Sequence, residues 1–377
     1  MILIRIKAIA VKEFYHLIRD YRSLYLAFAI PLILILLFGY ALSLDVENVK
    51  TMVVDYDQTQ GSRDFIRQID ASAYFRVLGR LQNEREATHC LDHGKAAMVI
   101  VIPVHWSRNL LSDRDAPIQV LVDGSDPNYA GIASGYINGI AARYNSRLLY
   151  EFLNKKGMEE ISPPIEARMR VWFNEDLESR NFIVPGIIAI IIMIVGAMLT
   201  SLVIAREYEN GTMETLFSLP IRAEEFLIGK SIPYFFIGMT DVLMAVLMGQ
   251  MLFDVIIKSG FWLLILASSL YLGVALGLGL LISILTKSQM VANQAAILIT
   301  YLPSLMLSDF VFPIVNMPKV LQAVTVVVPA KYFIDILNGL YLRNVGFEWL
   351  WKDFAVLSGM LLLFAGVALL KLKKEGL

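Results

Sequence analysis

The run FIVPGIIAIIIMIVGAMLTSLVIA, residues 182–205, carries no charged side chain and sets the architecture of this chain. An α-helix rises about 1.5 Å per residue, so a helix of this length would cross a hydrocarbon core about 30 Å thick. A helix also pairs its backbone N–H and C=O groups internally, as lipid requires, because lipid supplies no hydrogen bonds. The run therefore predicts a transmembrane helix.

The whole chain has the composition of an integral membrane protein. Of its 377 residues, 57% are hydrophobic and 18% are charged. Soluble domains average about 45–50% apolar and about 25% charged residues. The apolar residues are gathered in six runs, and the fifth of these is the least certain to span the membrane. We predict six transmembrane helices, at 25–42, 182–205, 231–253, 261–285, 290–308 and 350–370.

Two further features of the composition limit the function. The formal net charge is −1, which argues against a nucleic-acid partner. Cys90 is the single cysteine, so an intrachain disulfide is excluded. His89 and His93 lie beside it at helical spacing and leave a zinc site open. No fourth ligand is evident, and surface histidines beside a small buried thiol fit better.

The distribution of lysine and arginine predicts the orientation. Cytoplasmic loops of membrane proteins carry an excess of these residues. Twelve of them lie in 1–22, 206–230, 286–289 and the tail from 371, against about five in the short segments on the other side. We therefore expect both termini in the cytoplasm.

Charge and turn patterns divide the chain into segments. Residues 1–22 mix apolar and basic positions, which predicts an amphipathic helix on the cytoplasmic membrane surface, or else a plain extension of the first span. The first span, 23–44, is too long for a signal peptide and should stay uncleaved. Residues 45–180 predict a periplasmic α/β domain, and 181–377 hold the other five spans. Residues 309–348 are broken by prolines and predict half-helices that enter the outer leaflet.

Within the inserted domain, short apolar runs alternate with helical patterns. We expect strands at 51–57, 74–81, 96–102 and 118–125, with helices between them. A long helix at 127–157 and a last strand at 166–174 then lead back to the membrane.

The sequence GKS at 229–231 looks like the end of a phosphate-binding P-loop, but the glycine that such a loop needs five residues earlier is Glu224. We therefore expect no nucleotide site, no catalytic residue, no metal and no cofactor in this chain. Gly273 and Gly277 form a GxxxG pair, which is typical of close helix packing within a subunit or of a dimer seam.

Two polar side chains fall inside the predicted spans, namely Asp241 and Gln250. A buried carboxylate in a membrane is a candidate functional group, and a proton-coupled secondary transporter would use one. The spans offer no Lys, Arg or His partner for a proton relay. Pairing of Asp241 with a polar group on a neighbouring helix, or a place near a water-filled cavity, therefore fits better.

The segment AREYENGTMETLFSLPIRAEEF, residues 205–226, is densely charged between two apolar runs. Six stretches together resemble the membrane subunit of ABC exporters of the type-2 permease family. They are RIKAIAVKEFYHLIRDYRSL before the first span, VLVDGSDPNYA in the insertion, VWFNEDLESRNFIVPGIIA entering the second span, AREYENGTMETLFSLPIRAEEFLIGK after it, and LSDFVFPIVNMP and VPAKYFIDILNGLYLRN before the last span. They occur in the family's order along nearly the whole chain. Two positions depart from it: Asp309 replaces a common glycine, and Tyr21 a common proline.

The resemblance implies a function. Two such subunits, identical or paralogous, would form a translocation path in a bacterial inner membrane, in contact with membrane lipid. ATP and magnesium would bind separate cytoplasmic ATPase subunits that dock on 1–22 and on the coupling loop 205–230. A periplasmic adaptor and an outer-membrane channel would be further partners, and drugs, lipids or other amphipathic compounds the substrates.

The resemblance also assigns roles to residues. For contact with the ATPase we name Arg206, Glu207, Glu209, Gly211, Thr212 and Glu214. Gly211 and Thr212 would break and cap the helix there. For the outer half-helices we name Asp309, Pro313, Pro329 and Tyr332. Two alternatives remain: a secondary transporter that uses Asp241, and a membrane-anchored sensor whose active part is 45–180.

Overall fold

The computed structural model describes residues 2–41, 48–112, 114–155, 173 and 179–376. Residue contacts divide the chain into two units, Leu44–Met169 and a second unit made of Met1–Ser43 with Arg170–Leu377. The strand expected at 166–174 lies outside the described residues except for Phe173, and the expected end of the long helix at Gly157 lies outside them as well.

The unit Leu44–Met169 is an α/β fold with a four-stranded sheet in the order β2-β1-β3-β4. β1 pairs in parallel with β2 and β3, whereas β4 is antiparallel to β3. The strands are β1 (Val49–Asp55), β2 (Phe75–Leu81), β3 (Met98–Ile102) and β4 (Gln119–Val122). The helices are α3 (Gln60–Asp70), α4 (Glu84–Asp92), α5 (Trp106–Leu111) and α6 (Pro127–Lys155). All four strands and the helices between them lie where the alternating patterns predict them.

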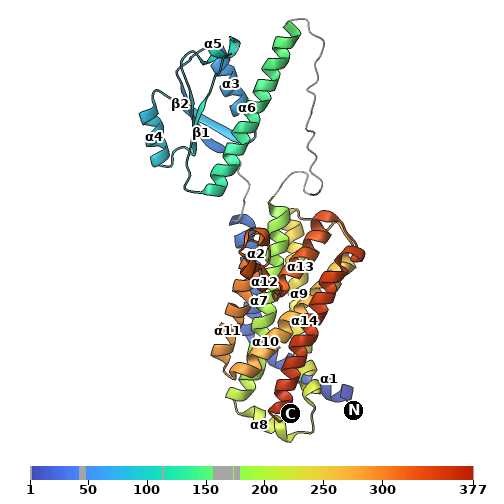
Figure 1. Ribbon diagram of the computed structural model, residues 1–377. Helices are drawn as coiled ribbons and strands as arrows, with labels where there is room; N and C mark the ends of the chain where they lie inside the picture. The colour runs from blue at the N-terminus through green and yellow to red at the C-terminus, as the bar shows by residue number, and fades with distance from the viewer. Residues whose placement is uncertain (1, 42–47, 113, 156–172, 174–178, 377) are drawn as a thin grey trace. The chain divides into compact units, whose positions relative to one another are not determined.

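Helices cover both faces of this sheet, α3 and α6 on one and α4 on the other (Figure 1). Successive strand side chains point to opposite faces, so Val53 packs in the cluster with Phe65 of α3, and Val54 in the cluster with Ala87 of α4. Cys90 is buried on the α4 side. The His89 and His93 rings stack 4.0 Å apart. Among the described residues, no three His, Cys, Asp or Glu side chains gather into a metal site.

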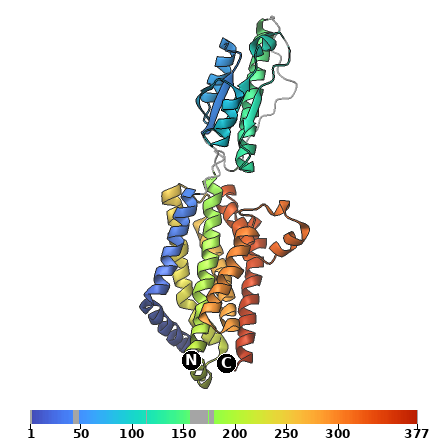
Figure 2. The same cartoon turned by 90° about the vertical axis from the view of Figure 1, so that its left-hand side faces the viewer.

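In the described part of the other unit every regular element is a helix, and the longer helices pack side by side (Figure 2). They are α1 (Ile2–Arg19), α2 (Tyr21–Ala41), α7 (Arg180–Glu209), α8 (Thr212–Ser218), α9 (Ala223–Phe253), α10 (Phe261–Thr286), α11 (Gln289–Met306), α12 (Lys319–Thr325), α13 (Pro329–Asn338) and α14 (Phe347–Lys374). A 3₁₀ turn, Ile314–Asn316, precedes α12, and a π turn, Gly339–Arg343, follows α13.

Within the described residues, four helices are long and apolar enough to cross a membrane, namely α7, α9, α10 and α14. A bent pair, α12 with α13 and its π turn, would count as a fifth, with an angle of 80° at the break. This pair lies in the segment for which we predict half-helices. The predicted spans at 25–42 and 290–308 fall on α2 and α11. In α2 the described apolar stretch, Ala27–Gly39, is short for a span.

The uncharged run at 182–205 forms most of α7, the central helix, which contacts α2, α9, α10, α11 and α13. Most of its side chains are buried, and the run has no polar face that could be exposed to water. Close packing depends on glycine: a Cβ on Gly279 of α10 would overlap the Ala197 carbonyl oxygen of α7. Gly273 and Gly277 face Leu361 and Phe364 of α14. The GxxxG pair therefore packs within this subunit.

The two ends of the helical unit differ in chemistry. Both termini and α8 lie at one end, and α12 lies at the other (Figures 1 and 2). Lys371, Lys373 and Lys374 end α14 on the first side. Large exposed aromatic side chains, Trp262 and Trp349, stand at the starts of α10 and α14 on the opposite side. Tryptophan is enriched where a membrane meets water, so this pair is consistent with a membrane boundary there.

We predict that Gly279→Ala destabilises the protein by about 1–3 kcal/mol, because the added methyl group must displace the backbone of α7. The matched control is Gly359→Ala on α14, where a Cβ meets nothing within 4 Å. Thermal unfolding of the purified proteins in detergent gives the comparison. Equal unfolding temperatures for the two variants would show that the contact between α7 and α10 is loose.

Candidate functional site

The turn after α7 is built around Gly211. Helix α7 ends at Glu209, and Asn210 is its C-cap. Gly211 follows with φ +70°, a left-handed conformation that glycine adopts without steric cost. The predicted break is therefore confirmed. The Thr212 hydroxyl lies within hydrogen-bond distance of the Glu207 carbonyl oxygen in the last turn of α7, at 3.2 Å, and of the Glu207 carboxylate.

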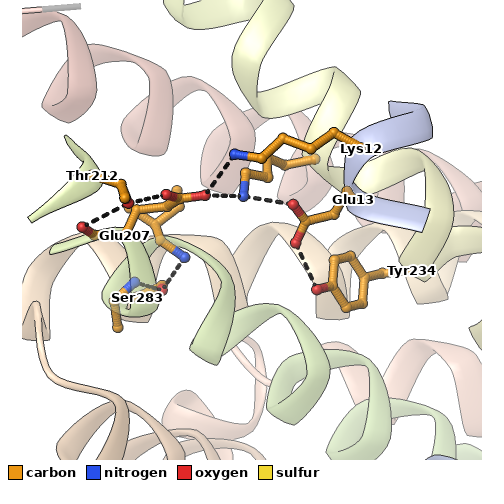
Figure 3. A network of polar contacts seen from close by, with 9 residues as sticks. Lys12, Glu13, Glu207, Thr212, Tyr234 and Ser283 are labelled. Carbon is orange, nitrogen blue, oxygen red and sulfur yellow. Dashed lines mark hydrogen bonds and ion pairs between the residues drawn. The ribbon is translucent and has the colours of Figure 1, made fainter. Parts of the chain in front are cut away.

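A buried ionic cluster lies beside this turn, formed by Glu13 of α1, Glu207 of α7 and Lys230 of α9 (Figure 3). The Lys230 ammonium donates to Glu13 Oε2 and to Glu207 Oε1, at 2.6 Å in each case. The three residues are 3–8% exposed. Burying an ion costs several kcal/mol unless charged partners stay in place. The cluster therefore holds the three helices in one arrangement.

Polar neighbours complete this cluster. The Tyr234 hydroxyl donates to Glu13 Oε1 at 2.9 Å. The Lys12 ammonium lies 3.8 Å from Glu207 Oε1 and is half exposed. Two carboxylates thus face two ammonium groups, and the cluster is formally neutral. Nearby, the Ser283 hydroxyl of α10 accepts from the N–H groups of Ile204 and Ala205 of α7.

Sequence reasoning missed Glu13 and Lys230. The signal for Glu13 is its place at the spacing Ile6, Ile9, Glu13, Leu17, the side of α1 that is turned inward. A charge on the inward side of a helix needs a partner. In the sequence, Lys230 belongs to the rejected P-loop pattern and is one of the basic residues that predict the orientation. Lys230 directly precedes the predicted span at 231–253, and this position is the signal for a buried cation.

The predicted coupling residues have different surroundings. Arg206 pairs with Asp20 at 3.3 Å, and Glu209 accepts from the N–H and the side-chain amide of Gln289 at the start of α11. Glu207 is 8% exposed, and its carboxylate pairs with Lys230 inside the protein. This burial disagrees with our expectation that Glu207 contacts a partner surface. Glu214, on α8, is exposed and makes no ion pair among the described residues.

A second ionic group ties the C-terminal segment to the same end. Glu375 accepts from the Tyr208 hydroxyl and pairs with Lys287 at 2.9 Å. Partial burial alone would raise the pKa of Glu375, but hydrogen bonds from Tyr208 and Lys287 lower it below its ordinary value. Lys373 pairs with Glu224 at 2.8 Å.

The two polar residues of α9 differ in exposure. Asp241 is 3% exposed, and neither carboxylate oxygen has a hydrogen-bond partner among the described residues. The expected pairing of Asp241 with a neighbouring polar group is therefore not found among the residues that the structure describes. Gln250 is exposed on the surface of the helix.

The outer residues shape the segment between α11 and α13. Asp309 has φ +69°, and its carboxylate accepts from the Ile314 N–H at 2.7 Å. Glycine, which the resemblance led us to expect at this position, would adopt this left-handed backbone without steric cost. Pro313 precedes the 3₁₀ turn, and Pro329 is the first residue of α13. The Tyr332 hydroxyl donates to the Val326 carbonyl at 2.8 Å.

The proline that the resemblance led us to expect at position 21 also has a local explanation. Tyr21 is the first residue of α2. Proline fits this position well because the first N–H of a helix has no partner within the helix, and the fixed φ of proline is helical.

Known proteins are similar to this chain along most of its length. The sequence profile described as "ABC-2 family transporter protein" matches residues 22–370. The probable multidrug ABC transporter permease YbhS of Escherichia coli is 36% identical over 372 residues, 98% of this chain and 97% of the relative. The probable multidrug ABC transporter permease YbhR of the same species is 29% identical, over 91% of each chain. The linearmycin resistance permease protein LnrN of Bacillus subtilis is 24% identical, over 90% of this chain and 91% of the relative.

We predict that Lys230→Met lowers the free energy of unfolding by about 3–5 kcal/mol, because two buried carboxylates lose their shared cation. Lys12→Met, which removes the half-exposed cation, should cost about 1 kcal/mol or less. Denaturant unfolding in detergent measures both changes. Adding Glu13→Gln and Glu207→Gln to Lys230→Met should restore much of the loss. Equal stability of the two single variants would contradict the assigned role of Lys230.

Proposed function

The chain belongs to the ABC-2 family of transporter proteins, and we propose that it is the membrane-spanning subunit of an ATP-driven exporter. In this proposal ATP and magnesium bind separate cytoplasmic ATPase subunits, and this chain holds neither a catalytic residue nor a cofactor. The observation that carries the proposal is the cluster of Glu13, Glu207 and Lys230. It joins α1, α7 and α9 at the end of the helical unit where both termini lie.

The ATPase docks at this end, on α1 and on the turn that contains α8. Glu13 and Glu207 anchor these two segments to α9, so a push on either one moves the first turns of a long membrane helix. The exposed carboxylate of Glu214 is available for a charge-assisted contact with the ATPase. Arg206, Glu209, Gly211 and Thr212 set the shape of the turn.

The membrane lies across the helical unit with both termini in the cytoplasm of a bacterial cell. Besides the four long apolar helices, α2 and α11 complete six spans, and α12 and α13 enter the outer leaflet. Helix α1 lies along the inner surface. It exposes large apolar side chains, among them Leu3, Ile4 and Phe14, which favours contact with lipid. The unit Leu44–Met169 then lies in the periplasm.

Substrates pass between two such subunits, identical or paralogous. Export of drugs, lipids or other amphipathic compounds is supported by the names of the relatives and by an apolar pocket of ≈ 410 Å³. Met193 of α7, Leu278 of α10 and Pro303 of α11 are among the residues that line it. A periplasmic adaptor and an outer-membrane channel would carry the substrate onward.

One observation favours a second candidate, a proton-coupled transporter. The Asp241 carboxylate is buried in α9 without a hydrogen-bond partner among the described residues, as a proton-accepting group would be.

Charge reversal at Glu214 tests the docking surface. We predict that Glu214→Lys weakens co-purification of the ATPase by about tenfold or more, because a contact with a cationic partner becomes repulsive. Drug resistance conferred by the complex should fall with it. The control is Glu348→Lys, also exposed but at the start of α14 on the opposite side. Unchanged ATPase recovery with Glu214→Lys would exclude this surface.

Substitution of Asp241 separates the two candidates. In an ATP-driven exporter, Asp241→Asn should leave drug resistance within about threefold of wild type, since the neutral amide suits the buried site. In a proton-coupled transporter, the same substitution should abolish transport. Transport by the wild type should then continue when the ATPase is inactive, and it should stop when the proton gradient is collapsed. Resistance assays with a paired inactive ATPase distinguish these results.

A further inference from the structure

The α/β unit contains a cavity of ≈ 580 Å³ that has no part in export as described above. It lies between α3, α5 and α6, the helices that share one face of the sheet. Small-molecule sites usually measure about 300–1,000 Å³, so the cavity is large enough for a metabolite-sized ligand. Its lining combines apolar residues with two arginines, two glutamines, hydroxyl groups and the Asp64 carboxylate.

The topology of the sheet explains the position of this cavity. Strands β1 and β3 are parallel neighbours, and the chain leaves β1 toward β2 on one side but leaves β3 toward β4 on the other. The carboxyl ends of these two strands therefore lie side by side, and α/β proteins commonly bind ligands outside the carboxyl ends of their strands. Thr59 follows β1 and Ser107 follows β3. Both line the cavity, and their hydroxyls lie 2.6 Å apart.

The cationic side chains of the lining come from two different helices. Arg108 lies on α5 and Arg147 on α6, and both are exposed. Arg108 makes no ion pair with any carboxylate among the described residues. A guanidinium presents its N–H groups as a planar fork that matches an oxyanion.

The other residues that line the cavity indicate which groups the ligand carries besides its acid group. Leu110, Leu148 and the Tyr144 ring provide apolar surface, and Gln60 and Gln68 add amides. Asp64, which lines the cavity, and Asp57, which lies near it, already have partners. Asp64 pairs with Arg67, and Asp57 accepts from the hydroxyls of Thr59 and Ser107. The arginines of the cavity therefore suit the acid group of a ligand, and the apolar walls suit the rest of that ligand.

We propose that this cavity binds a small organic acid, with its oxyanion at Arg108 and Arg147 and its apolar body against Leu110 and Leu148. The site lies in a different unit from the proposed coupling surface, and it does not depend on the export function. It makes the inserted unit a ligand-binding module.

Fluorine NMR on the full chain in zwitterionic phosphatidylcholine nanodiscs tests this site. The probe is para-(trifluoromethyl)benzoate, with empty nanodiscs as background. The neutral para-(trifluoromethyl)benzamide serves as the matched probe without charge. We expect saturable line broadening of the benzoate and affinity about tenfold lower for the benzamide, since charge-assisted hydrogen bonds are lost. Absence of saturable broadening with the wild-type protein would overturn the proposal.

Variants locate the binding. Arg108→Gln with Arg147→Gln should weaken benzoate binding about tenfold or more. The control, Arg85→Gln, removes an exposed arginine from α4 on the opposite face of the sheet and should bind as wild type does. Gln68→Trp, which fills the cavity from α3, should reduce the affinity for both probes. Equal binding by the double arginine variant and by Arg85→Gln would also overturn the proposal.

Discussion

The Lys230 ammonium is almost excluded from water, and this constraint explains much of the helical unit. A buried cation is tolerated only while its carboxylate partners stay close. Those partners come from α1 and α7, which are separated from Lys230 by 217 and 23 residues. The N-terminal helix, the turn after the central span and the start of α9 are therefore held in one arrangement. Movement of one of them without the others would leave a buried charge unpaired.

The central position of α7 follows from a different constraint. It has no polar face, so it is the span best suited to complete enclosure, and glycine at position 279 allows α10 to approach its backbone. The Glu207 carboxylate and the Gly211 turn come directly after this apolar run. The most buried helix thus ends in the segment that we propose for contact with the ATPase. A force on that segment would reach the core of the bundle without a flexible linker between them.

Much of this fold could be predicted because it depends on local patterns. Apolar runs located the helices, alternating runs located the four strands, and Gly211 and the prolines located the turns. The ionic cluster could not be predicted, because it depends on contacts between residues far apart in the chain. From sequence, Glu207 was one of several glutamates in a charged loop. Only packing shows that it points inward to Lys230, whereas Glu214 stays exposed. For Asp241, the expected polar neighbour is not found among the described residues, because such a contact also depends on packing between helices.

Hydrogen–deuterium exchange of the α1 backbone amides most directly tests whether Lys230 holds this end of the protein together. Compared with Lys12→Met, the Lys230→Met variant should exchange the amides of residues 2–19 faster by about tenfold or more, because α1 opens from α9 more easily. The amides of α10 should be much less affected. Equal protection of α1 in the two variants would contradict the account and would show that apolar packing alone fixes this helix.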